Sequence, residues 1–163
     1  MKSPRKSQTA DQSLREHLIA ALHGGQAHIT FDKAVRAFPL DRIGVRPRGL
    51  PHSAWELLEH IRLAQVDILR FSQSADHVSA PWPEGYWPES PAPASAKEWS
   101  ASIRRYRKDL AEFEALLLDP AQKLHRKFPW GSGQTLLREA LTLVDHTSYH
   151  LGQLLLVRQL VEG

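Results

Sequence analysis

Residues 53–72 read SAWELLEHIRLAQVDILRFS and form one of the clearest helical patterns in the chain. Ser53 followed three residues later by Glu56 is typical of a capping box, in which each side chain bonds the backbone N–H at the other position. Apolar side chains then recur every three or four residues, at Leu57, Ile61, Ala64, Ile68 and Phe71. These features predict an amphipathic helix from residue 53 to about residue 72.

Helical patterns also precede this stretch. A first helix is expected from about Ser13, with Ser13 and Glu16 as a capping box, to Gly24-Gly25. A short amphipathic helix is expected next, ending at Pro39, with apolar side chains at Ala27, Phe31, Ala34, Val35 and Phe38. Residues 1–10 are polar and are expected to form a frayed tail, so the predicted single domain spans residues 11–163.

Two longer helices are expected in the second half of the chain. The first runs from about Ser95, its capping residue, to Leu118, with an apolar stripe at Trp99, Ile103, Tyr106, Leu110, Phe113 and Leu117. The second runs from about Ser132 to Val161. We expect one apolar row on this helix at Leu137, Leu141, Val144, Ser148, Leu151 and Leu155, and a second row at Leu143, His146, His150, Leu154 and Val157.

The connection between residues 74 and 95 contains five prolines and three aromatic residues, Trp82, Tyr86 and Trp87. Prolines prevent a continuous helix here, and the aromatic residues indicate an ordered crossover that packs on the domain rather than a flexible linker. No segment alternates with a period of two over a useful length. The sequence therefore predicts an all-α four-helix bundle with a long Pro/Trp-rich crossover between the second and third long helices.

Composition limits the possible functions. The chain has 163 residues, 42% of them apolar, a net charge of +3 and no cysteine. It therefore has no thiol nucleophile of its own. The small positive charge and the lack of a basic recognition helix argue against a nucleic-acid partner. No apolar run is long enough to span a membrane, and no apolar segment follows the basic N-terminus, so we expect a cytoplasmic protein.

Two histidines in the last helix carry the strongest chemical signal. His146 and His150 are four residues apart, so their imidazoles project from consecutive turns of one helix face and can bind one divalent ion. Their row is otherwise apolar, and buried imidazoles need partners. The other interpretation is two hydrogen-bonded histidines without a metal. His60, on the inner edge of the second long helix, is the best candidate for a third ligand.

Three imidazoles leave a coordination position open, as in catalytic metal sites. Residues close to these histidines in the sequence are candidates to orient the ligands or to take part in catalysis: Glu59, Asp145 and Gln153. Each of them has a plainer interpretation, as a solvated charge or a partly buried amide. The sequence does not distinguish zinc from nickel, copper or iron.

Three segments resemble the DinB/YfiT-like superfamily of helical bundle proteins: residues 53–62 (SAWELLEHIR), residues 82–88 (WPEGYWP) and residues 146–153 (HTSYHLGQ). The resemblance implies a four-helix bundle that binds a divalent metal such as nickel or zinc through His60, His146 and His150. It also implies that homodimers are common. Characterised members include transferases that use low-molecular-weight thiols such as bacillithiol or mycothiol, and a maleylpyruvate isomerase.

Three functions remain open from the sequence. The first is a metal-dependent thiol transferase that joins a low-molecular-weight thiol to an electrophilic substrate. The second is a metal-dependent hydrolase, with Glu59 or Asp145 as a base. The third is a non-enzymatic stress or interaction module in which the metal only links helices, a role that usually requires four protein ligands.

Overall fold

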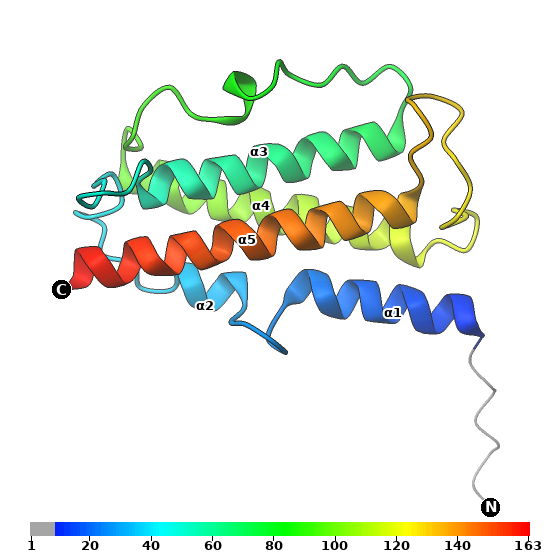
Figure 1. Cartoon of the computed structure of the whole chain (residues 1–163), viewed down its shortest axis with the longest axis horizontal. Helices are drawn as coiled ribbons and strands as arrows, with labels where there is room; N and C mark the ends of the chain where they lie inside the picture. The colour runs from blue at the N-terminus through cyan, green and yellow to red at the C-terminus, as the bar shows by residue number, and fades with distance from the viewer. Residues whose placement is uncertain (1–8) are drawn as a thin grey trace, which may run out of the picture.

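The computed structural model describes residues 9–163, and the regular structure in this part of the chain is helical (Figure 1). The elements are α1 (Ala10–His23), α2 (Phe31–Val35), α3 (Ala54–Gln73), the 3-10 helix η1 (Glu84–Tyr86), α4 (Ala96–Leu118) and α5 (Leu136–Glu162). Among these residues, β pairing is limited to one isolated bridge between Lys127 and Thr135. The predicted all-α class is confirmed.

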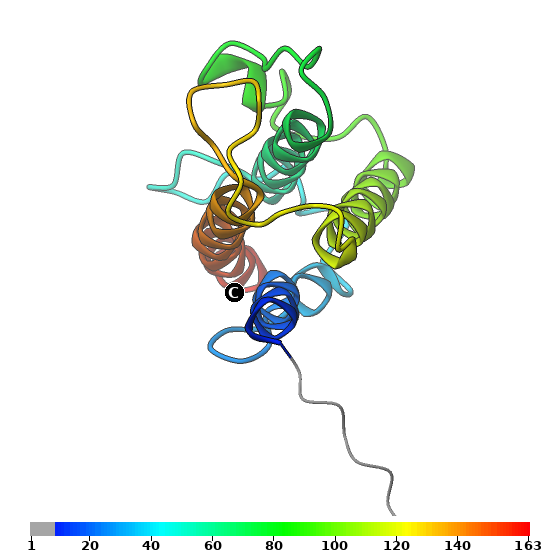
Figure 2. The ribbon, with the colours of Figure 1, turned by 90° about the vertical axis from the view of Figure 1, so that its right-hand side faces the viewer.

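The four long helices α1, α3, α4 and α5 pack side by side, as the end-on view in Figure 2 shows. α3 and α4 run in the same direction, because contacts between them advance together along both helices. Gln65 donates to the carbonyl of Tyr106 at 2.8 Å, and one turn further on Arg70 pairs with Glu112 at 2.7 Å. The connection from α3 to α4 must therefore return along the bundle, and it does so over the outer side of α3 (Figure 1).

The N-terminus of α3 is fixed by the predicted capping box. The backbone N–H of Glu56 donates to Ser53 Oγ at 3.2 Å, and the backbone N–H of Ser53 donates to Glu56 Oε2 at 2.8 Å. The Glu56 carboxylate also pairs with Arg46 in the preceding loop. Ser95 caps α4, as the sequence predicted. These caps set the register of the two helices that flank the crossover.

The starts of the other helices differ from the sequence predictions. α1 begins at Ala10 because Thr9, with Gln12, forms its capping box, so the expected box at Ser13 is wrong. The predicted tail falls mainly on residues 1–8, which lie outside the described residues. α2 is shorter than expected and begins after its cap Thr30, which leaves Ala27 exposed. Thr135, three residues after Ser132, caps α5.

The core confirms the predicted stripe of α4, since all six of its residues are buried. On α5 the two predicted rows have different roles. Leu143, Leu154 and Val157, in the row that contains the histidines, are each at most 1% exposed, whereas Leu141 in the other row is 53% exposed. Leu141 therefore lies outside the core although Leu151, in the same predicted row, is 2% exposed. The histidines of the other row contact His60 of α3.

We expect Ser53→Ala to lower the free energy of unfolding by about 1–2 kcal/mol, because a buried helix cap is lost. Chemical denaturation monitored by circular dichroism measures the effect. Ser100→Ala is the matched control: Ser100 is exposed in the interior of α4, where alanine has the higher helix propensity. Equal stability of the two variants would contradict the role given to the cap.

Candidate metal centre

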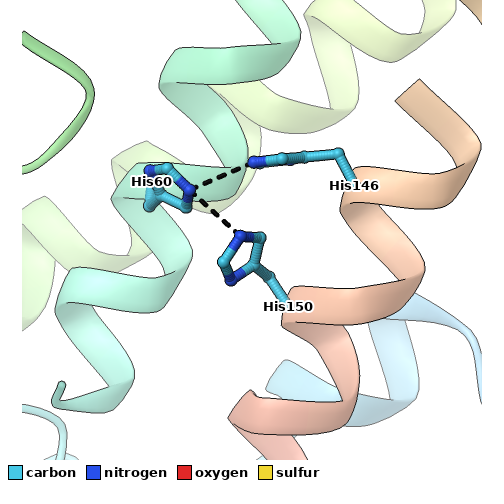
Figure 3. A group of neighbouring side chains, drawn as sticks. All are labelled: His60, His146 and His150. Carbon is cyan, nitrogen blue, oxygen red and sulfur yellow. Dashed lines mark hydrogen bonds between the residues drawn. The ribbon is translucent and has the colours of Figure 1, made fainter. Parts of the chain in front are cut away.

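Three imidazoles from two helices converge at the middle of the α3–α5 contact (Figure 3). His60 Nε2 lies 3.1 Å from His150 Nε2 and 3.1 Å from His146 Nε2. His60 is 1% exposed, and His146 and His150 are half-buried. The structure thus brings together the three residues that the sequence singled out, and their ring nitrogens form a group that could hold a metal ion.

The crossover fixes the orientation of His60. His60 Nδ1 lies 2.8 Å from the backbone carbonyl of Tyr86, at the end of η1. A carbonyl oxygen only accepts hydrogen bonds, so Nδ1 carries the proton and donates it. The ring of Trp87 stacks on the imidazole of His60, with centroids 3.9 Å apart and an interplanar angle of 2°. The side chain of His60 is thereby held in one rotamer and one tautomer.

A carboxamide fixes the orientation of His150 in the same way. His150 Nδ1 donates to Gln153 Oε1 at 2.7 Å, one turn along α5. His146 is held less firmly, because its Nδ1 is buried without a hydrogen-bond partner among the described residues. Of the three residues suggested from the sequence, Gln153 is thus the one whose side chain contacts a histidine of the group.

These hydrogen bonds determine which ring nitrogens of His60 and His150 carry a lone pair at the centre of the cluster. With the protons of His60 and His150 on Nδ1, both Nε2 atoms present lone pairs at a separation of 3.1 Å. Two lone pairs repel each other unless a cation lies between them. The group of three imidazoles could therefore hold a positive ion.

Burial keeps the three rings neutral at pH 7. It lowers the pKa of His60 to about 4 and the pKa of His146 to about 4, and it also lowers the pKa of His150. Neutral imidazole is the form that binds metals. Two nitrogens bound to one ion at about 2.0–2.1 Å, with an angle near 100° between them, lie roughly 3.1 Å apart. The donor type, the protonation and the two spacings from His60 therefore suit a divalent ion, and the three nitrogens all lie within 4.8 Å of one another.

The two carboxylates proposed from the sequence lie elsewhere. Glu59 is buried, but Arg62 donates to its oxygens at 2.9 and 2.6 Å and Ser102 donates to the same carboxylate. Burial alone would raise the pKa of Glu59, but these hydrogen bonds outweigh it and hold the pKa below its usual value. Asp145 is exposed on the outer side of α5. The structure brings neither carboxylate into the group of imidazoles.

Other histidines of the described residues lie outside the group of three. His23 pairs with Glu114 and His77 with Asp67, while His28 contacts the hydroxyl of Ser148 at 3.1 Å. His52 stacks on the second face of Trp87, with centroids 4.0 Å apart. His52 is therefore a neighbour of the site through Trp87, although it is not one of the three converging imidazoles.

Sequence reasoning missed the role of the crossover at the site. The aromatic residues of the loop were expected to pack on the domain. Tyr86 and Trp87 do so, whereas Trp82 is 68% exposed. The sequence did not reveal that Trp87 would stack on His60 or that the carbonyl of Tyr86 would accept its proton. The only available signal was the position of Trp87 in a proline-rich segment, which has no periodicity from which a neighbour can be deduced.

Comparison with known families agrees with this architecture. The family model of the DinB superfamily matches residues 23–154, which includes all three histidines. The chain belongs to the DinB superfamily. Among curated proteins, none matches this DinB chain, and no solved structure matches it. Within residues 9–163, no helix is long and apolar enough to cross a membrane.

We expect Gln153→Leu to weaken metal binding by about 10- to 100-fold, because His150 loses the acceptor that keeps its proton on Nδ1. Competition with a chromophoric chelator measures the affinity for zinc. Gln159→Leu is the matched control, since Gln159 is exposed on the same helix. Unchanged zinc affinity in Gln153→Leu would show that the Nδ1 hydrogen bond does not support the ligand.

Proposed function

We propose that this DinB protein is a metal-dependent enzyme of the thiol-transferase type, with His60, His146 and His150 as ligands of one divalent ion, zinc or nickel. The observation that carries the proposal is the convergence of the Nε2 lone pairs of His60 and His150 at 3.1 Å. A metal ion with an open coordination position lowers the pKa of a bound thiol, so that the thiolate forms at neutral pH.

The reaction transfers an external thiol to an electrophile. The sulfur forms a bond to carbon of the substrate, the leaving group departs with its electron pair, and the thiol proton passes to solvent. The protein contains no cysteine, so the sulfur nucleophile must come from a small molecule. The residues of the chain hold the site in place: Tyr86 and Gln153 fix the two tautomers, and Trp87 shields one face of His60.

Two alternatives have less support. The hydrolase alternative used Glu59 or Asp145 as a base, and neither belongs to the histidine group. A purely structural metal usually has four protein ligands, and the group found in residues 9–163 contains three. Both observations favour an open site that a thiol can enter. The cytoplasm, where low-molecular-weight thiols are kept reduced, is the location that fits this chemistry.

Elemental analysis of untagged protein tests the ligand set. We expect about one zinc or nickel ion per chain in the wild type and loss of the ion in His60→Ala and His146→Ala. His125→Ala is the control, because His125 is exposed in the loop before α5. A folded wild type that takes up neither metal would refute the proposal. Metal retained by both ligand variants would refute the assigned ligands.

We further propose that the chain forms a homodimer through the outer face of α5. Exposed apolar side chains follow this face, at Leu141, Tyr149 and Leu160, which are 52–64% exposed. Gly152 lies on the same face and has open space beside it, so another helix can approach closely. Several exposed apolar side chains on one helix face favour an interaction surface.

Light scattering during size-exclusion chromatography tests the dimer. We expect the wild type to have twice the mass of one chain and Leu141→Glu/Leu160→Glu to be monomeric, because buried charges oppose association. Leu118→Glu is the control, since Leu118 is 60% exposed at the end of α4, away from this face. A monomeric wild type would exclude the dimer.

A further inference from the structure

A cavity of about 120 Å³ lies between α3, α5 and the loop that precedes α3. Its walls are mainly aliphatic, with two polar side chains among them: Leu50, His52, Leu57, Gln153, Leu156 and Val157. Two features set the cavity apart from other hollows of the surface. Residues of α3 and α5, the two helices that carry the histidines, line it. Gln153 lines the cavity and also accepts the hydrogen bond from His150.

The cavity adjoins the histidine cluster along the α3–α5 contact. Leu57 lies three residues before His60 on α3, and Gln153 lies three residues after His150 on α5. Residues three apart are neighbours on a helix face, so the cavity and the cluster occupy successive turns, about 5 Å apart along the helix axes. The cavity is therefore within the length of a small molecule from the cluster, with Leu57 and Gln153 between the two.

The side chain of Gln153 lies between the cavity and the histidine cluster and has polar groups available to both. Its Oε1 accepts the proton of His150 Nδ1, whereas its Nε2 amino group has no hydrogen-bond partner among residues 9–163. The side chain thus offers a donor at the junction of an apolar cavity and the proposed metal. Small-molecule sites typically have this composition, an apolar wall with a few polar groups that fix orientation.

We propose that this cavity receives the apolar part of the electrophilic substrate, a group of up to the size of a phenyl ring. The inference rests on the proposed function. The volume is close to that of an apolar protein cavity of about 150 Å³ that binds benzene. It is too small for the remainder of a larger cofactor thiol, which must lie elsewhere, whereas a single small apolar group attached to a metal-bound atom fits it. The substrate class is a compact electrophile with a short aliphatic or aromatic substituent.

Two simple thiols test this assignment on cobalt-loaded protein. Benzyl mercaptan joins a sulfur atom to an apolar ring, whereas 2-mercaptoethanol has the sulfur without the apolar group. Binding of either thiolate to cobalt produces a sulfur-to-metal absorption band, and titration gives the dissociation constants. We expect benzyl mercaptan to bind at least tenfold more tightly than 2-mercaptoethanol, because its ring leaves water for the cavity.

A cavity-filling variant supplies the decisive comparison. Leu156 lines the cavity and is 45% exposed, so Leu156→Trp has room to fold. We expect it to remove the preference for benzyl mercaptan while cobalt content and 2-mercaptoethanol binding stay unchanged. Leu160→Trp is the control, because Leu160 is also an exposed leucine of α5 but does not line the cavity.

The outcomes separate this inference from the proposed function. Failure of the wild type to bind cobalt, or to bind either thiol, would contradict the proposed function itself. Binding of both thiols with equal affinity would leave the metal–thiol chemistry standing and overturn the cavity assignment. The cavity assignment is equally overturned if Leu156→Trp keeps the preference for benzyl mercaptan.

Discussion

The hydrogen bond from His60 Nδ1 to the carbonyl of Tyr86 is the contact on which the candidate site depends. It fixes the proton on one side of a buried ring, so the opposite nitrogen must present a lone pair to the interior. The same logic applies to His150 through Gln153. Because burial also disfavours the charged form of all three rings, protonation does not relieve the repulsion at neutral pH. A divalent cation between the Nε2 atoms would remove this repulsion.

The direction of the helices explains why a loop supplies the key acceptor. α3 and α4 are parallel neighbours, so the chain must travel back along the bundle between them. The returning segment lies over α3 (Figure 1). Its η1 ends at Tyr86, whose carbonyl accepts from His60, and Trp87 stacks on the imidazole. The crossover is thus a wall of the site as well as a connection. The cavity beside Gln153 lies at the next turn of the same two helices, which gives a substrate a place next to the proposed metal.

Much of this arrangement can be predicted from the sequence because side chains on one face of a helix recur every three or four residues. The stripe of α4 and the caps at Ser53 and Ser95 follow from local spacing, and the structure has them all. The i, i+4 pair His146 and His150 is read in the same way. The prediction was wrong where two residues could each cap the same helix, because Thr9 and not Ser13 caps α1. On α5 the apolar residues cover more than one face, so periodicity alone did not show that Leu141 is exposed. The contacts of Trp87 and Tyr86 depend on the path of an aperiodic loop, which no spacing rule describes.

Nitrogen NMR of the histidine side chains tests the central claim most directly. In metal-free protein at pH 7, His60 and His150 should be neutral with the proton on Nδ1, and addition of zinc should shift the Nε2 signals of His60, His146 and His150 together. His125, exposed in the loop before α5, provides an internal reference that should not shift. Protons on Nε2 of His60 or His150, or Nε2 signals that do not respond to zinc, would contradict the account.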